Sequence, residues 1–392
     1  MKVAVFCHSM LSDWNHGNAH FLRGIGRELL RAGHQPRFFE PIDAWSVENL
    51  VADAGPAALD GWRPHYPEFA ISRYRLSELD LDAALEGVQL VLMHEWNSPD
   101  LVRRLGALRA RGARFRLLFH DTHHRLLTAP EEFTRFDFSG YDGVLAFGEV
   151  LRERYAARGW GRRAYTWHEA ADVELFRSRR DRGHTGDLVW IGNWGDEERT
   201  RELQEYLLDP VRELSLACHV HGVRYPESAR AALRSAGALY RGWLPNYRVP
   251  EVFGGFRVTV HVPRRPYAEA LPGIPTIRPF EALACGIPLL SAPWSDSEGL
   301  FRVGQDFLVA RDGAEMRRML RAVLSDAELA GWLARSGQET IRRRHTCAHR
   351  VQELLEICRE IGADGVEPGS DCSSARTTPR VSPEPSVCEE TA

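Results

Sequence analysis

Residues 278–290 read Arg-Pro-Phe-Glu-Ala-Leu-Ala-Cys-Gly-Ile-Pro-Leu-Leu, and this segment indicates the architecture of the chain more directly than any other. The small and apolar residues after Glu281 predict a short helix, and Gly286 supplies the backbone freedom for a corner. The apolar run 287–290 predicts a buried strand. We expect Glu281 at the start of the helix, near unpaired N–H groups and the positive end of the helix dipole. Such a corner suits a phosphate on the N–H groups and a sugar ring on the carboxylate.

The same alternation of strands and helices extends outward from this corner. In the first half, strand-like runs at 3–7, 36–39, 88–93, 115–119 and 143–147 are interleaved with helical segments at 19–31, 77–85, 99–111 and 149–158. The pattern restarts with a strand at 188–191, a helix at 197–213 and strands at 217–221, 239–241 and 258–262. Strands that alternate with helices predict parallel, doubly wound sheets. The sequence therefore predicts an α/β protein with two Rossmann-like domains and a ligand site in the cleft between them.

The two predicted domains are nearly equal in length. We expect a first domain over 1–170 and a second over 171–345, with the connection near 165–186. Thr346 is a suitable N-cap for a final helix at 347–361, within a segment 346–362. After Gly362 the chain is rich in Ser, Thr, Pro, Gly and Glu, which predicts a disordered tail over 363–392.

Composition excludes several classes of function. Lys2 is the only lysine, so neither a P-loop nor a Schiff-base enzyme is expected. The net charge of −4 argues against a nucleic-acid binder, and the seven cysteines form no CxxC pair. No apolar run reaches the roughly 18 residues of a membrane helix. Because a strand begins at Lys2, we expect no signal peptide and a cytoplasmic location. The arginines at 103–116 leave peripheral membrane contact open, although a solvated helix face is the simpler interpretation.

The 278–290 segment is similar to the FEAxACG signature in the C-terminal domain of family-4, GT-B-fold glycosyltransferases. Arg278, three residues before Glu281, resembles the CgeB-like (spore-maturation-type) branch of that family. The resemblance covers about residues 1–361 and is strongest over 188–310. It implies retaining transfer of a sugar from a nucleoside diphosphate sugar to an unknown acceptor, without a cofactor. Asp80 and Asp82 form the DxD pattern of metal-dependent transferases, but both fall at a predicted helix start, so we expect metal-independent transfer.

The donor site is expected on the second domain. The resemblance assigns the ribose to Glu281 and the diphosphate to Arg278, whereas the structural alternative is that Glu281 caps its helix and Arg278 pairs with a nearby carboxylate. Gly273 occupies the position of a second family glutamate, so we expect the backbone N–H of Gly273 or Ile274 to face the sugar or phosphate. The other donor-side candidates lie at a glycine-flanked turn, among the arginines and around the expected base pocket: Asn193, Trp194, Arg199, Gly242, Trp243, Arg264 and Phe280.

The catalytic candidates lie in the first domain. His120 and Asp121 follow a buried strand at its carboxyl end, where open α/β sheets bind ligands. His120 resembles the histidine that family-4 enzymes direct at the transferred sugar, and Asp121 is expected to orient the acceptor or the imidazole. A metal site with His123 and His124 is a weaker alternative because the spacing is not helical. Gly17 and Asn18 match the family's glycine loop near the phosphates and the acceptor.

Two other functions share this donor pocket. A GT-B nucleotide-sugar epimerase requires carboxylates and a histidine around the sugar carbon, and Gly273 removes one carboxylate from the expected set. A catalytically inactive sugar-nucleotide-binding protein is the second alternative, with the 363–392 tail as a recruiting element. Product analysis without an acceptor separates the epimerase from the transferase.

Overall fold

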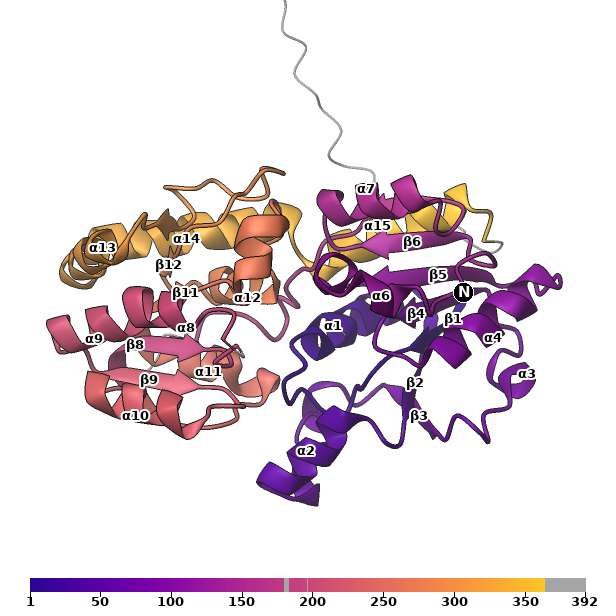
Figure 1. The fold of residues 1–392 in the computed structure, drawn as a ribbon, viewed down its shortest axis with the longest axis horizontal. Helices are drawn as coiled ribbons and strands as arrows, with labels where there is room; N and C mark the ends of the chain where they lie inside the picture. The colour runs from indigo at the N-terminus through magenta and orange to yellow at the C-terminus, as the bar shows by residue number, and fades with distance from the viewer. Residues whose placement is uncertain (180–182, 196, 364–392) are drawn as a thin grey trace, which may run out of the picture.

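The computed structural model describes residues 1–179, 183–195 and 197–363, and the predicted tail from 364 onward lies outside them. These residues form two α/β domains that lie side by side (Figure 1). Each domain is built on a sheet in which all strand pairs are parallel. This arrangement confirms the predicted α/β fold with two doubly wound, Rossmann-like domains. Among the described residues no helix has the length and apolar character needed to cross a membrane.

The first domain is built on a seven-stranded sheet. In spatial order its strands are β3 (Ala70–Tyr74), β2 (Gln35–Pro41), β1 (Lys2–Phe6), β4 (Leu90–His94), β5 (Arg116–Asp121), β6 (Gly143–Ala146) and β7 (Ala164–Thr166). The α-helices are α1 (Asn18–Arg31), α2 (Trp45–Ala54), α3 (Leu81–Ala84), α4 (Pro99–Ala110), α5 (Arg125–Thr128), α6 (Pro130–Phe133) and α7 (Glu149–Arg158). Because β1, β4 and β5 are adjacent, the loops that follow them meet at one edge of the sheet.

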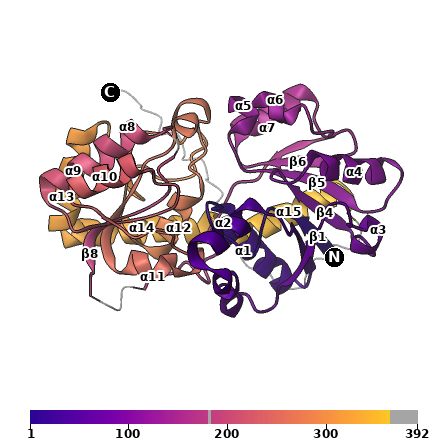
Figure 2. The same cartoon turned by 60° about the horizontal axis from the view of Figure 1, so that its bottom comes forward.

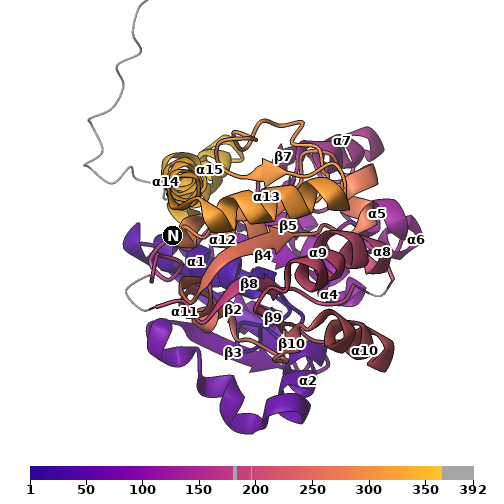
Figure 3. The same cartoon turned by 90° about the vertical axis from the view of Figure 1, so that its left-hand side faces the viewer.

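The second domain is built on a six-stranded sheet. Its order is β10 (Leu239–Tyr240), β9 (Cys218–His221), β8 (Gly186–Ile191), β11 (Phe256–His261), β12 (Leu289–Ser291) and β13 (Leu308–Val309). Its helices are α8 (Thr200–Leu203), α9 (Asp209–Leu214), α10 (Glu227–Ala236), α11 (Val249–Gly254), α12 (Ile277–Cys285), α13 (Gly313–Ser325) and α14 (Ala327–Arg344). Helices cover both faces of this sheet, as the side view in Figure 3 shows.

Alternate residues of β8 pack into two different hydrophobic clusters. Leu188 and Trp190 belong to the apolar cluster that includes residues of α9, α10 and α13. Val189 and Ile191 belong to the cluster that includes residues of α11 and α12. Successive side chains of a strand point to opposite faces, so a central strand covered on both sides is apolar throughout.

The final helix, α15 (Cys347–Glu360), returns to the first domain and packs against α1 (Figure 2). The Thr346 hydroxyl accepts a hydrogen bond from the His349 N–H, which confirms the predicted N-cap. Gly24 of α1 lies where the two helices meet, and a Cβ at that position would be 2.5 Å from Cys347 Sγ. Leu354 and Ile357 share a cluster with Val5 of β1. The chain end therefore contributes to the core of the first domain.

Several elements differ from the sequence-based expectations. The predicted helix at 77–85 shortens to α3, because the Asp80 carboxylate accepts hydrogen bonds from the N–H groups of Asp82 and Ala83 and starts the helix there. The predicted helix at 197–213 contains a π-helical turn, Gln204–Leu208, between α8 and α9. Helix α12 begins at Ile277, four residues before the expected start. The sequence pattern did not predict three strands, β3, β7 and β13, or seven helices, α2, α5, α6, α10, α11, α13 and α14.

Candidate functional site

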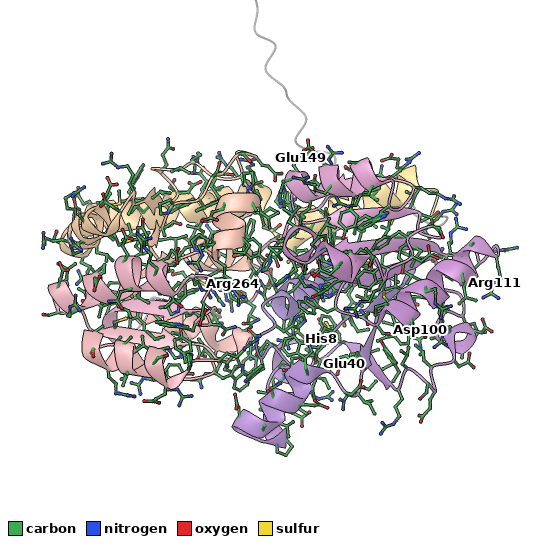
Figure 4. All side chains as sticks on the ribbon, viewed as in Figure 1. His8, Glu40, Asp100, Arg111, Glu149 and Arg264 are labelled. Carbon is green, nitrogen blue, oxygen red and sulfur yellow. The ribbon has the colours of Figure 1, made fainter. Side chains whose placement is uncertain are left out.

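Two adjoining cavities lie between the domains, on the side where the carboxyl ends of both sheets face each other. The first has a volume of about 250 Å³ and the second about 750 Å³. Gly17 and His123 of the first domain and Arg264 and Ile277 of the second line both. Figure 4 places Arg264 at the boundary between the two domains. The two cavities therefore form one continuous interdomain site, as expected for this architecture.

The first cavity is rich in guanidinium groups. Arg199, Arg264 and Arg278 all line it, together with Asn193 and other second-domain residues. Arg264 Nη1 donates to Glu198 Oε2 at 2.9 Å, and Arg278 donates to Glu281. Together with Trp243, five of the predicted donor-site residues thus line one pocket.

Arg199 is the most buried of these arginines. Its Nη1 donates to Val262 O at 2.9 Å and its Nη2 to Asn193 O at 2.6 Å. Its guanidinium lies 5.1 Å from the Trp190 ring centroid. Burial, followed by the charge of Arg264, lowers the pKa of Arg199 to about 9. Backbone carbonyls, not a carboxylate, hold this cation among the described residues, so an anion in the cavity would supply the missing countercharge.

The N-terminus of α12 also opens into the first cavity. Thr276, Ile277 and Arg278 line the wall, and no side chain caps the helix. Thr276 has φ +61°, a left-handed conformation that is strained for a β-branched residue. Uncapped helix N–H groups beside arginines form an anion-binding arrangement. The predicted phosphate contact with the helix start stays a prediction, and the N–H groups available for it belong to residues 277 and 278.

Glu281 lies deeper than expected. It is the fifth residue of α12, which places it in the second turn, and it is fully buried and absent from both cavity walls. One carboxylate oxygen accepts from Arg278, and Oε1 lies 2.6 Å from His20 Nδ1 of the first domain. The predicted position at the helix start is wrong, because the helix begins four residues earlier. The ribose contact stays a prediction, while the alternative pairing of Arg278 with a carboxylate is present.

Trp243 forms another part of the first cavity wall. Its Nε1 donates to Asp13 Oδ1 at 3.1 Å, and Asn246 N donates to Asp13 Oδ2 at 3.0 Å. Arg23 Nη1 holds the same carboxylate at 3.2 Å. A buried first-domain aspartate thus fixes the second-domain loop that carries the predicted base-flanking tryptophan. The neighbouring Gly242 is not on either wall, and its carbonyl accepts from Gly222 N.

Four further donor-site candidates are structural. Trp194 is buried beside Tyr225, and Phe280 packs on Phe301. The N–H of Gly273 donates to Ser295 O at 2.6 Å, and that of Ile274 donates to Leu271 O. The expectation that either amide faces a sugar or phosphate is therefore wrong, because both are already used within the protein.

The segment around Gly273 instead joins the two domains. Ile274 packs against Gly148, where an added Cβ would lie 2.3 Å from Ile274 Cγ1. Beside it, Glu298 Oε1 accepts from Glu149 N at 2.9 Å, at the start of α7. Glu298 Oε2 lies 2.9 Å from His168 Nε2. These contacts hold the two domains together.

His120 and Asp121 do not act as a pair. Successive strand residues point to opposite faces, so the two side chains diverge at the end of β5. His120 is buried against Trp167, at 4.9 Å between ring centroids, and burial lowers its pKa to about 3. Asp121 accepts from Tyr155 Oη at 2.8 Å and from His123 N at 3.1 Å. The expected orienting role of Asp121 toward His120 is therefore wrong, and neither side chain is on a cavity wall.

Asn18 lies on the second cavity wall, as the glycine-loop prediction expects. Its Nδ2 donates to Thr122 Oγ1 at 2.7 Å and lies 3.1 Å from His94 Nε2. Burial lowers the pKa values of His94 and His16, so these rings are neutral at physiological pH. Among the described parts of the chain, no group of three His, Cys, Asp or Glu side chains is arranged to hold a metal ion.

His123 and Glu169 line the second cavity, although the sequence pattern assigns neither of them to a substrate site. His123 belongs to the same histidine-rich segment as His120. Only the alternation of side-chain direction along the strand could have distinguished the two positions. Glu169 lies between β7 and β8, where no local pattern marks it. Burial, followed by the charges of Glu281 and Glu95, raises the pKa of Glu169 to about 8. Its carboxyl therefore retains a proton near neutral pH and can both donate and accept hydrogen bonds.

Three tryptophans complete the second cavity: Trp14, Trp45 and Trp96. They come from three different segments, following β1, β2 and β4. Trp45 is 6.4 Å from Trp14 and 6.2 Å from Trp96 between ring centroids, with T-shaped geometry in both pairs. The sequence analysis did not single out any of them, because their grouping depends on the order of the strands.

Comparison with known proteins agrees with this geometry. Residues 199–356 match the sequence model of a family described as glycosyl transferase-like. A search of the curated proteins finds no match to this sequence. Among solved structures, sucrose-phosphate synthase from Thermosynechococcus elongatus has a TM-score of 0.62 at 13% identity, covering 93% of this chain and 100% of the other.

Two further solved structures give similar values. Anabaena HepE in complex with UDP-glucose has a TM-score of 0.62 at 13% identity, covering 92% of this chain and all of its own. A glycosyltransferase from Rickettsia africae has a TM-score of 0.62 at 9% identity, covering 92% of this chain and 98% of the other. The chain therefore has the GT-B fold, and its second domain contains a glycosyl transferase-like region.

Proposed function

We propose that this protein is a glycosyltransferase that moves a sugar from a nucleoside diphosphate sugar to an acceptor hydroxyl. The observation that carries the proposal is the first cavity, where three arginines and the uncapped start of α12 converge. We further propose a retaining, metal-independent enzyme of the CgeB-like branch. The branch rests on Arg278 and Glu281, which lie at the family's spacing and are in contact.

Charge favours a diphosphate in the first cavity. Among its described wall residues, three arginines face one aspartate, and Asp13 is already engaged by Trp243, Asn246 and Arg23. Guanidinium groups form paired, charge-assisted hydrogen bonds with phosphate oxygens. Nearby, Trp243 offers an indole surface for the base. A nucleoside diphosphate fits this combination of a cationic end and an aromatic end better than a neutral sugar does.

The proposed reaction breaks the bond between the anomeric carbon and the phosphate oxygen, and forms a bond from that carbon to the acceptor oxygen. The departing diphosphate keeps the bonding electron pair, and arginines and helix N–H groups placed in advance stabilise its charge. The acceptor hydroxyl loses its proton to a phosphate oxygen on the same face of the sugar. No carboxylate base is then needed, in contrast to glycosidases, which use two carboxylates.

A panel of nucleotide sugars tests the donor assignment. The full chain is heated with UDP-, GDP-, ADP- or dTDP-sugars, and the unfolding temperature is recorded. A ligand present at a hundred times its Kd adds about 2.7 kcal/mol of stability. Because HepE is known in complex with UDP-glucose, UDP-sugars are the first probes. The proposal fails if no nucleotide sugar raises the unfolding temperature.

Product analysis then separates transfer from the alternatives. Donor is incubated without any acceptor, and the sugar nucleotide is examined by NMR. A transferase leaves the donor unchanged or slowly hydrolyses it. An isomeric sugar nucleotide would instead identify an epimerase, and binding without turnover across acceptors of several classes would identify a sugar-nucleotide-binding protein.

A further inference from the structure

The second cavity differs from the first in both size and chemistry. It is about three times larger, and its described wall has two arginines, Arg224 and Arg264, and two glutamates, Glu198 and the protonated Glu169. Arg264 pairs with Glu198 at 2.9 Å. Its three wall histidines are neutral, because burial lowers the pKa values of His16, His123 and His124. The described wall therefore has a lower formal charge than that of the first cavity, where three arginines face one aspartate.

Two of its tryptophans have one face covered from within the protein. His8 stacks on Trp45 with 4.4 Å between ring centroids. The Arg125 guanidinium lies 3.7 Å from the Trp96 ring centroid, where Glu95 and Glu132 hold it. Both indoles stay partly exposed, and both line the cavity. Fixed aromatic rings of this kind provide flat, rigid contact surfaces.

Hydrogen-bonding groups share the cavity wall with these indoles. Asn49, Thr122 and Glu169 line the same cavity as Trp45 and Trp96. Glu169 is only 6% exposed, and among the described residues it forms no hydrogen bond or ion pair. A buried carboxyl without a partner is costly, so the side chain requires a ligand or water. An alkyl chain would leave these polar groups unsatisfied.

We propose that the second cavity is the acceptor site, that its acceptor is a neutral saccharide, and that Glu169 hydrogen-bonds the saccharide hydroxyls while Trp96 packs against its ring. A pyranose has apolar C–H faces and a rim of hydroxyls, which matches a wall that carries both indole and polar groups. This inference rests on the proposed transfer reaction. It names the class of acceptor and assigns Glu169, which contacts substrate on this view, as a specificity-determining residue.

The test uses the full chain with the donor found in the nucleotide panel. Release of nucleoside diphosphate is measured with neutral mono- and oligosaccharides, with long-chain alcohols in vesicles of neutral phospholipid, and with Ser- and Thr-containing peptides. We expect saccharides to stimulate release and the other two classes not to. If alcohols or peptides support turnover and saccharides do not, the proposal is overturned.

Variants then locate the saccharide. Trp96→Ala should raise the KM for the saccharide at least tenfold and change the donor KM less than twofold. Trp332→Ala is the matched control, because Trp332 lies on α14 and is 43% exposed. Equal KM values for the saccharide in the two variants would exclude stacking on Trp96. Unfolding temperatures of both variants confirm that each is folded.

Glu169 is tested by two substitutions. Glu169→Ala removes the hydrogen bonds and should raise the saccharide KM about tenfold, whereas Glu169→Gln keeps a neutral donor and acceptor and should raise it no more than threefold. If the saccharide KM rises equally in both variants, the role of a neutral carboxyl is overturned. Nucleotide binding without any saccharide-dependent turnover would overturn the acceptor assignment and leave the donor proposal intact. Absence of nucleotide binding would instead remove the proposed function itself.

Discussion

The two adjoining cavities share part of their walls but are chemically unlike. The first has three arginines, one aspartate and the uncapped start of α12, whereas the second has two arginines, one of them paired with Glu198, and three tryptophans. The charged cavity draws most of its wall from the second domain, and the aromatic cavity draws most of its wall from the first. Because Gly17, His123 and Arg264 belong to both, substrates held in the two cavities would meet at these residues. The contrast is what we expect if each domain binds one of the two substrates of the proposed reaction.

The largest effect is expected from Arg199→Met, which removes charge from the first cavity only. Hydrogen bonds to charged groups contribute about 1.5–3 kcal/mol, so the nucleotide Kd should rise roughly tenfold to 150-fold. Titration calorimetry measures this change. Arg265→Met is the matched control, because Arg265 pairs with Glu202 outside the cavity. Equal nucleotide affinities in the two variants would show that the charge of the first cavity is not used.

Glu281→Ala should weaken nucleotide binding about ten- to hundredfold, from the same range of charge-assisted bonds. Since Glu281 is buried and bound to Arg278, we expect the loss to act through Arg278. Kd values for the nucleotide and its 2′- and 3′-deoxy forms distinguish action through Arg278 from a direct contact with the ribose. If Glu281 acts through Arg278, the variant weakens the binding of all three nucleotides equally. A loss confined to the form with both hydroxyls would establish the direct ribose contact that the family resemblance implies.

His123→Ala should affect both substrates, because His123 lines both cavities. A lost hydrogen bond of about 1 kcal/mol predicts a roughly fivefold fall in kcat/KM. His120→Ala is the comparison: this ring is buried off the walls, so the variant should chiefly lower the free energy of unfolding. If His120→Ala instead reduces kcat selectively in a folded protein, the direct role implied by the family resemblance is correct.

The smallest effect is expected at Asp80, which lines neither of the two cavities. Asp80→Ala removes the N-cap of α3 and should lower the free energy of unfolding by about 0.5–2 kcal/mol without changing kcat. Urea denaturation and an activity assay in excess EDTA check both parts. If activity is lost in EDTA, or if a folded Asp80 variant is inactive, the DxD motif is a metal site and not only a helix start.

Much of the fold was predictable because it depends on local patterns. The apolar run at β8, the helix-to-strand corner after α12 and the Thr346 cap each follow from a few neighbouring residues. Helices α13 and α14 were missed although their aspartate caps are visible in the sequence, at Asp312 and Asp326. The short strands β3 and β7 carry weak signals, because they lie at the edges of the sheet and are only partly buried.

The sequence by itself determined the two doubly wound sheets and the cationic character of the donor side, since Arg199, Arg264 and Arg278 are the residues available there. Only the tertiary structure decided that Glu281 lies below the wall and that His123 is on it in place of His120. It also decided that Trp14, Trp45 and Trp96 share a cavity with Glu169. Local patterns specify periodicity and turns, whereas the walls of a cavity depend on strand order and on the packing of segments that are distant in the chain.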